Sequence, residues 1–84
     1  MDTAVRLKRL YYQSGHRGTK ELDIILGNFA EKFLHTLEPS EINDYEALLE
    51  VEETDLYNWL TGIEPAPEAF DTPVFKNIAM HRPL

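Results

Sequence analysis

The sequence predicts an all-α fold, a small five-helix bundle in which residues 1–84 form a single helical domain. Two observations lead to this prediction. Apolar side chains recur at three- and four-residue spacing along most of the chain, as they do on the buried face of a helix. Residues that favour helix ends, among them Gly15, Ser40 and Gly62, stand between these apolar runs. The alternation of apolar and polar residues that is typical of a half-buried strand is not found.

The first two helices are predicted over residues 4–14 and 20–36. Gly15 is a natural end for the first helix, because glycine readily adopts the conformation that often follows a helix C-terminus. The inward stripe of the first helix comprises Ala4, Leu7, Leu10, Tyr11 and Ser14, and that of the second comprises Leu22, Ile25, Leu26, Phe29 and Phe33. A short turn is therefore expected between the two helices.

A third helix is predicted over residues 41–50, with Ser40 as the N-cap whose hydroxyl accepts a hydrogen bond from the first free backbone N–H groups. Thr54 is expected to cap a short fourth helix in the same way. Gly62 ends that helix, because glycine is favoured just beyond a helix C-terminus.

The segment IEPAPEAFD, residues 63–71, contains two prolines and cannot be a regular helix throughout. It is expected to be a loop that carries Phe70 inward. Thr72 and Pro73 then suit the cap and the first residue of a fifth helix. Val74, Phe75, Ile78 and Ala79 form the apolar face of that helix.

The core of the bundle is expected to contain Phe29, Phe33, Leu48, Leu49 and Trp59. If Trp59 is buried there, Trp59→Ala should lower the free energy of unfolding by about 3 to 5 kcal/mol.

Length and composition exclude several classes of protein. The 84 residues include no cysteine, which rules out disulfides, thiolate metal sites and cysteine nucleophiles. No run approaches the roughly 18 to 20 apolar residues needed to cross a bilayer, and the N-terminus lacks the apolar run of a secretory signal. A soluble protein of a reducing compartment, without membrane insertion, is therefore expected.

The net charge of −7 is unevenly distributed. Residues 1–20 carry a local balance of +4, whereas residues 21–72 carry fourteen acidic residues and Lys32 alone against them. An acidic body repels phosphate backbones, so nucleic-acid binding is not expected. A protein partner fits this charge distribution better.

Catalytic and cofactor sites lack the residues that they need. His16 has no serine or cysteine nucleophile pattern beside it, and Glu31 with His35 offers only two metal ligands. Gly18 precedes a helix, but neither a strand nor further glycines accompany it, as a dinucleotide site requires. The chain is therefore predicted not to be an enzyme and not to hold a metal or a cofactor of its own stably.

The segment HRGTKE, residues 16–21, is the strongest candidate for a binding site. If the first helix continued so far, Arg6, Arg9, Gln13 and Arg17 would align as one basic ridge. Two interpretations of Arg17 remain open from spacing alone. It pairs with Glu21 across the turn, or it points outward and offers a planar five-donor fork to a partner. In the outward arrangement, Gly18 lets a partner's backbone approach and Arg17→Ala changes the free energy of unfolding by no more than roughly 0.5 kcal/mol.

Three segments of the chain resemble the succinate dehydrogenase assembly factors that promote covalent flavin attachment to the flavoprotein subunit. They are KRLYYQS, HRGTKELDIILGNF and ALLEVEETDLYNWLTG, and the likeness extends over roughly residues 6–80. Thr19 stands where the family pattern has a methionine, whereas Arg17, Gly18 and Glu21 match it.

The resemblance implies a five-helix fold and a non-catalytic role. The implied partner is the flavoprotein subunit of succinate dehydrogenase, with that of fumarate reductase as a second, and FAD is then the partner's cofactor. Carried over by position, Arg17, Gly18 and Glu21 become the partner contacts, with His16 and Arg9 as flanks. The implied location is the cytoplasm of a bacterium, or the mitochondrial matrix for a processed eukaryotic form. The competing hypothesis is a general adaptor or antitoxin-like module that uses the same surface for an unrelated protein.

Overall fold

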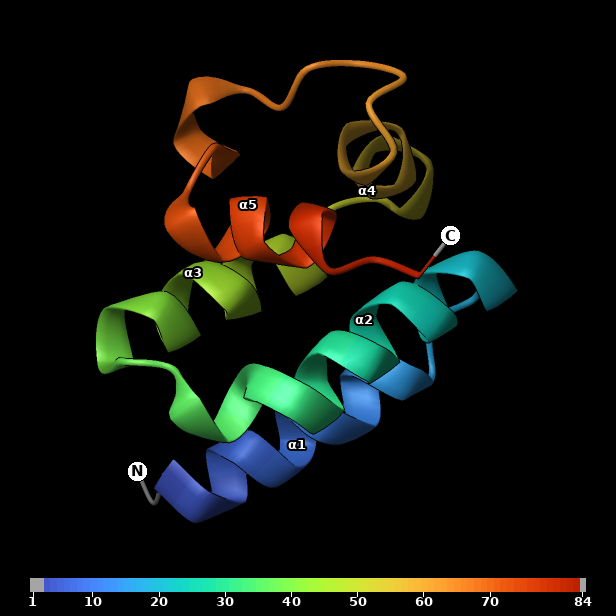
Figure 1. The fold of residues 1–84 in the computed structure, drawn as a ribbon. Coiled ribbons are helices and arrows are strands. Elements are labelled where there is room, and N and C mark those ends of the chain that lie inside the picture. Colours follow the sequence, from blue (N-terminus) through green and yellow to red (C-terminus); the bar gives the residue numbers. More distant parts are fainter. Residues whose placement is uncertain (1–2, 84) are drawn as a thin grey trace.

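The computed structural model describes residues 3–83, and within that range the chain forms five α-helices, two short 3₁₀ helices and no strand (Figure 1). The all-α prediction is thereby confirmed. The α-helices are α1 (Thr3–Gly15), α2 (Lys20–Phe33), α3 (Pro39–Leu49), α4 (Glu53–Leu60) and α5 (Pro73–Met80). The 3₁₀ helices are Leu34–Thr36, which replaces the predicted last turn of α2, and Glu68–Phe70.

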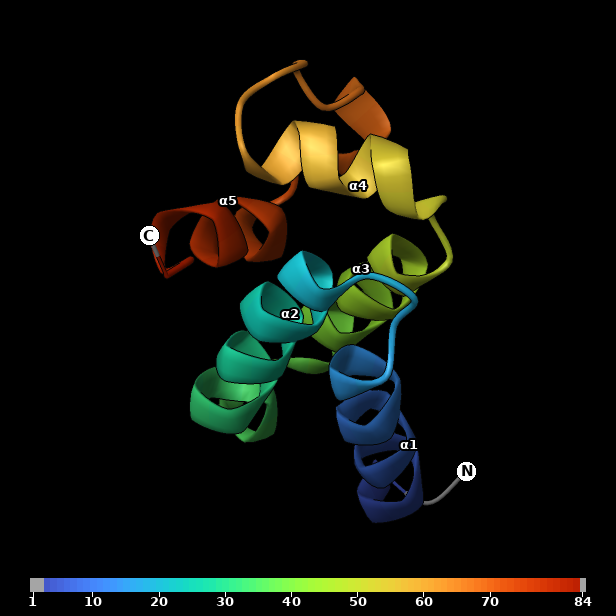
Figure 2. The same cartoon turned by 90° about the vertical axis from the view of Figure 1, so that its right-hand side faces the viewer.

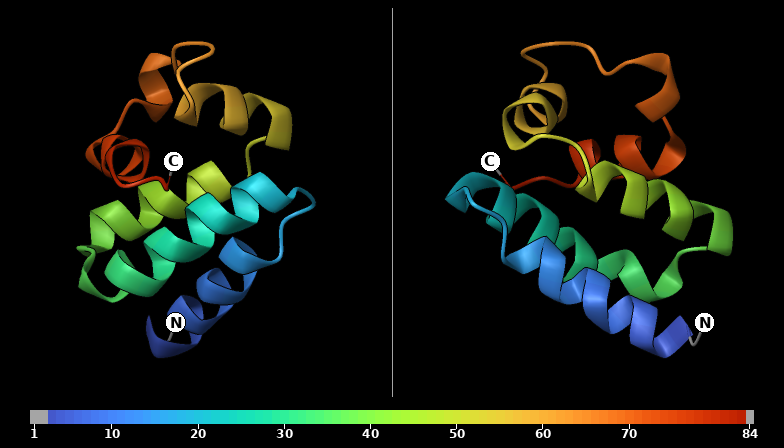
Figure 3. Two further views of the ribbon diagram at one scale, coloured as in Figure 1. Left: turned by 45° about the vertical axis from the view of Figure 1, so that its right-hand side comes forward. Right: turned by 180° about the vertical axis from the view of Figure 1, so that it is seen from behind.

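The first two helices run antiparallel beside each other and are joined by the turn at residues 16–19 (Figures 1 and 3). α3 also packs against α1, and α5 contacts α2, α3 and α4. The described chain ends near the start of α2, where Arg82 and Pro83 lie beside Glu21 and Ile24. Among residues 3–83, no helix is both long enough and apolar enough to span a bilayer.

Two of the predicted helix caps are wrong. α3 begins at Pro39, so Ser40 lies inside its first turn, and the carboxylate of Glu41 accepts a hydrogen bond from the Glu38 N–H (2.9 Å). α4 begins at Glu53 because Glu52 is the cap. The cap residues are therefore Glu38 for α3 and Glu52 for α4, and each helix begins earlier than predicted. A carboxylate, like a hydroxyl, can accept hydrogen bonds from the free N–H groups at a helix N-terminus.

At the start of α4, the Glu52 side chain accepts a hydrogen bond from the Asp55 N–H (3.2 Å), whereas Thr54 is exposed within the first turn. The predicted cap of the last helix is confirmed. The Thr72 hydroxyl accepts from the Phe75 N–H (3.2 Å), and Pro73 is the first helical residue.

Trp59 lies at the edge of the core and is only partly buried. Its ring packs against Phe70 with 5.4 Å between ring centroids, so the loop over residues 63–71 does carry Phe70 inward. Because the indole keeps part of its surface in water, truncation of Trp59 should cost less than the 3 to 5 kcal/mol expected for full burial.

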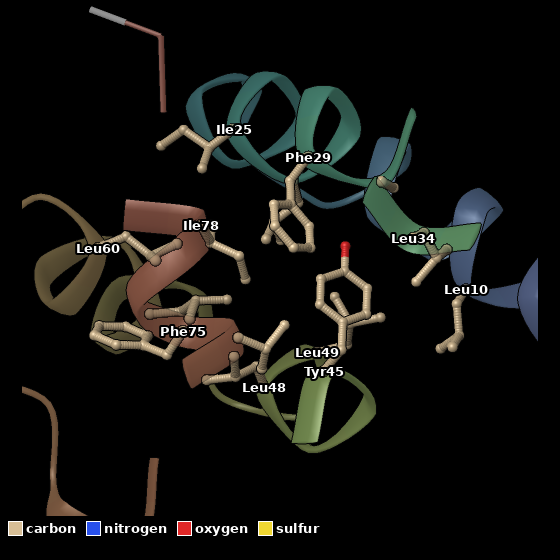
Figure 4. Packing of buried hydrophobic residues seen from close by; sticks show 14 of the residues in the cluster. Leu10, Ile25, Phe29, Leu34, Tyr45, Leu48, Leu49, Leu60, Phe75 and Ile78 are labelled. Carbon is tan, nitrogen blue, oxygen red and sulfur yellow. The ribbon is translucent and has the colours of Figure 1, made fainter. Parts of the chain in front are cut away.

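The core gathers buried side chains from all five α-helices (Figure 4). Of the predicted core residues, Phe29, Leu48 and Leu49 are buried, whereas Phe33 only packs against the cluster. Tyr45 of α3 is the largest fully buried side chain and contacts the Phe29 ring at 5.6 Å between centroids. The middle of α3 therefore faces α2 through an aromatic pair.

The Tyr45 hydroxyl is also the polar centre of the core, where it meets the buried Ser14 hydroxyl of α1. Ser14 Oγ donates its single proton to the Leu10 carbonyl (2.7 Å), so Tyr45 must be the donor to Ser14. All three groups are then satisfied, as buried polar groups require. Burial raises the pKa of Tyr45 to about 12, an effect that the hydrogen bond to Ser14 only partly offsets.

Tyr45→Phe should lower the free energy of unfolding by about 1 kcal/mol near neutral pH, because one buried hydrogen bond is lost. Since the folded-state pKa lies above the ordinary value of about 10, the hydroxyl stabilises the fold fully below pH 10, and this contribution disappears as the pH rises toward 12. Urea unfolding of both proteins across this range measures the difference. A difference that stays constant up to pH 12 would show that the hydroxyl titrates normally.

Candidate functional site

The predicted binding segment is the turn between α1 and α2, which lies beside the end of α3 and the start of α4 (Figure 2). α1 ends at Gly15 and α2 begins at Lys20, so residues 16–19 are the connection. α1 does not continue to Arg17, so the condition for a basic ridge from Arg6 to Arg17 is not met.

Arg17 is not directed at solvent, which corrects the outward interpretation. Its side chain is only 11% exposed. Nη1 donates to the Leu49 carbonyl (2.6 Å) and Nη2 to the Val51 carbonyl (3.2 Å). Leu49 ends α3, and the last carbonyls of a helix have no partner within it and carry the negative end of its dipole. The guanidinium thus caps the C-terminus of α3 from another part of the chain.

The predicted pairing of Arg17 with Glu21 is also absent. The acidic partner of the guanidinium is Glu53, with 4.0 Å between Nε and Oε1. That separation makes an ion pair rather than a hydrogen bond, and the buried Nε has no hydrogen-bond partner. The backbone N–H of Arg17 donates to the carboxylate of Asp23 in the first turn of α2 (2.5 Å). Arg17 is therefore bound to α2, α3 and α4 at once.

Gly18 is exposed, and its N–H donates to Glu53 Oε1 (2.6 Å). A Cβ placed on Gly18 would lie 2.8 Å from Glu53 Oε2. The backbone at Gly18 is not in the left-handed region, so glycine is not needed there for its dihedral angles. It is needed for the close approach of the Glu53 carboxylate.

Glu21 and His16 are both exposed on either side of Gly18. Glu21 lies in the first turn of α2 and borders a surface cavity of about 310 Å³ together with Thr19, Glu53, Thr54 and Tyr57. The His16 ring stacks on Tyr12 with 4.0 Å between centroids, and its Nδ1 lies 2.8 Å from the Tyr12 carbonyl. Both side chains are accessible to a partner.

Arg9 is separated from the turn, because it lies six residues before the end of α1, roughly 9 Å along the helix axis. Arg9 and Arg6 both donate to the Glu46 carboxylate of α3, at 2.5 and 3.0 Å. The hydrogen bond from Arg6 is the main cause that lowers the pKa of Glu46. Arg6 and Arg9 thus share one carboxylate of α3, and the Arg9 side chain remains 49% exposed.

Glu53 and Asp23 are the residues of this site that sequence reasoning missed. Glu53 belongs to the acidic run EVEETD, and it lies 35 residues from Gly18 in the chain. No local pattern indicates such a contact. Among residues 3–83, no three histidine, aspartate or glutamate side chains converge as a metal site would require. The arrangement is suited to presenting a rigid backbone edge.

The sequence is similar to that of known proteins. Residues 8–82 match the family model described as flavinator of succinate dehydrogenase. A mitochondrial succinate dehydrogenase assembly factor 2 of Dictyostelium discoideum is 40% identical over 74 residues, which cover 88% of this chain and 52% of the relative. The FAD assembly factor SdhE of Acetobacter pasteurianus is 39% identical over 75 residues, covering 89% and 69% respectively. The chain thus spans about half the length of the Dictyostelium relative and more of the bacterial one.

Arg17→Ala should lower the free energy of unfolding by about 2 to 3 kcal/mol, because two hydrogen bonds from a charged donor are lost and two helix-end carbonyls lose their partner. Arg17→Lys should recover little of this, since an ammonium group cannot reproduce the planar fork. Urea unfolding measures both variants, with the neighbouring exposed Lys20→Ala as a control that should stay within about 0.5 kcal/mol of the parent. An Arg17→Ala protein as stable as this control would contradict the capping role.

Proposed function

Because the chain belongs to the family of flavinators of succinate dehydrogenase, we propose that it binds the flavoprotein subunit of that enzyme and promotes covalent attachment of FAD to it. The observation that carries the proposal is the match over residues 8–82, which spans the turn and most of the helical fold. The relatives are described as assembly factors rather than enzymes.

The docking edge in this proposal consists of His16, Gly18 and Glu21. All three residues are exposed; His16 and Gly18 belong to the turn, and Glu21 lies in the first turn of α2. Arg17 supports the edge from beneath, because its guanidinium is directed inward to α3. Arg9 flanks the edge on α1 with the exposed half of its side chain.

In this proposal the chain acts by binding, and the covalent step takes place on the partner. There is no cysteine, and His16 is held against Tyr12 through its ring and its Nδ1. The partner's own residue forms the bond to FAD, and this chain favours the conformation of the flavoprotein in which that bond forms. FAD is then the partner's cofactor, and no stable FAD site on this chain is needed.

The flavoprotein of fumarate reductase is a second candidate partner of the same docking edge, and a general adaptor function is the alternative. Relatives occur in a bacterium and in mitochondria. The proposed location is accordingly the bacterial cytoplasm or the mitochondrial matrix.

Adding the chain to apo-flavoprotein and FAD should increase covalent flavin, measured as fluorescence of the denatured flavoprotein band. Glu21→Lys should weaken binding to the flavoprotein by about tenfold or more, because a reversed charge at a docked site opposes the partner's complementary charge. Its free energy of unfolding should stay within about 0.5 kcal/mol of the parent, as expected for an exposed residue.

Glu31→Lys is the matched control, since it makes the same charge change at an exposed position of the same helix, roughly 15 Å further along its axis. It should bind and stimulate as the parent does. Covalent flavin that does not respond to the parent chain would overturn the proposed function. Equal binding by the Glu21→Lys and Glu31→Lys variants would instead overturn the docking edge.

A further inference from the structure

Glu53 places one carboxylate between two residues of the turn. Its Oε1 accepts the hydrogen bond from the Gly18 N–H at 2.6 Å and lies 4.0 Å from Arg17 Nε. The Arg17 guanidinium is held in turn by the two carbonyls at the end of α3. A single acidic side chain therefore joins the exposed backbone of the turn to the buried cation beneath it.

The backbone of Glu53 is held in place by its helix. Glu53 is the first residue of α4, whose Leu56 and Leu60 are buried in the core. A carboxylate in the first turn of a helix is also stabilised by the helix dipole. The Glu53 side chain is about one-third exposed, so it can reach the turn from α4 without a full cost of desolvation.

The requirement for glycine at position 18 follows from this contact. A Cβ at Gly18 would lie 2.8 Å from Glu53 Oε2, closer than real Cβ contacts allow, and 3.0 Å from Oε1, which is tight. The carboxylate is the far end of a flexible side chain and can move away. A side chain at position 18 therefore need not unfold the protein, but it must displace the Glu53 carboxylate from the Gly18 N–H.

We propose that Glu53 is a positioning residue for flavoprotein docking, which holds the Gly18 backbone over the inward Arg17 guanidinium in the geometry that the partner binds. This inference rests on the proposed function. Without the carboxylate, the Gly18 N–H loses its partner and the turn samples other conformations. Binding must then order the turn again. The apparent affinity is reduced in proportion to the fraction of molecules whose turn is in the binding-competent conformation.

The test compares three variants in binding to apo-flavoprotein and in stimulation of covalent flavin. Glu53→Ala should weaken binding by about tenfold or more, since a hydrogen bond to a charged group is lost. Glu53→Gln should restore affinity to within about threefold of the parent, because its amide oxygen can still accept from Gly18. Glu52→Ala is the matched control, which removes a charge and a helix cap at the same end of α4 but does not contact the turn.

Hydrogen exchange of the Gly18 amide in the free chain separates positioning from direct contact. It should accelerate in Glu53→Ala and stay slow in Glu53→Gln and Glu52→Ala. A Glu53→Ala variant that binds like the parent, or a Glu52→Ala variant that loses as much affinity, would overturn the inference. Weakened binding with unchanged Gly18 exchange would overturn it too, because Glu53 would then contact the partner directly.

A double-mutant cycle gives a second, independent readout. Gly18→Ala should weaken binding in the parent but add little to Glu53→Ala, because both changes remove the same contact. Fully additive effects would contradict the inference. The Glu21→Lys and Glu31→Lys pair reports on the docking edge separately, so failure of the Glu53 inference is distinguishable from failure of the proposed function.

Discussion

The buried guanidinium of Arg17 is the contact on which the arrangement of this small protein depends. It caps α3 through Leu49 and Val51 and faces Glu53 of α4, while its own backbone N–H binds Asp23 of α2. Three helices, α2, α3 and α4, therefore meet at one residue of a four-residue turn. A chain of 84 residues has a small core, and apolar packing alone specifies relative helix positions weakly. The hydrogen bonds and ion pair of the Arg17 guanidinium therefore help to fix these positions.

Polar contacts join α1 and its following turn to α3 along the whole length of their interface. Arg6 and Arg9 bind Glu46, Ser14 binds Tyr45, and Arg17 binds the end of the helix. α1 and α2, in contrast, pack through buried apolar side chains such as Leu10 and Leu26, whereas the predicted inward residues Ala4 and Tyr11 of α1 are exposed. The polar contacts set the register of α1 against α3 and thereby the place at which the turn emerges beside α4. If the chain docks as proposed, function and stability are coupled at Arg17 and separable at Glu21.

Local features of the sequence were sufficient for the helices but not for the site. The Thr72 cap and the end of α1 near Gly15 were predicted correctly, because both depend on residues within one turn of the helix terminus. The caps at Ser40 and Thr54 were wrong because a neighbouring glutamate could do the same work. The direction of Arg17 could not be predicted, since its acceptors lie 32 and 34 residues away in the chain and no spacing rule connects them. Glu53 was missed for the same reason, because it lies 35 residues from Gly18 in the chain. The exposure of Gly18 and Glu21 agreed with expectation.

Hydrogen exchange of the chain, free and bound to the flavoprotein subunit, tests the central claim most directly. If the turn supported by Arg17 is the docking edge, amides of residues 16–21 should gain protection on binding, while the loop over residues 63–71 on the opposite side of α4 exchanges as in the free chain. Protection confined to residues 63–71, with residues 16–21 unchanged, would contradict the account.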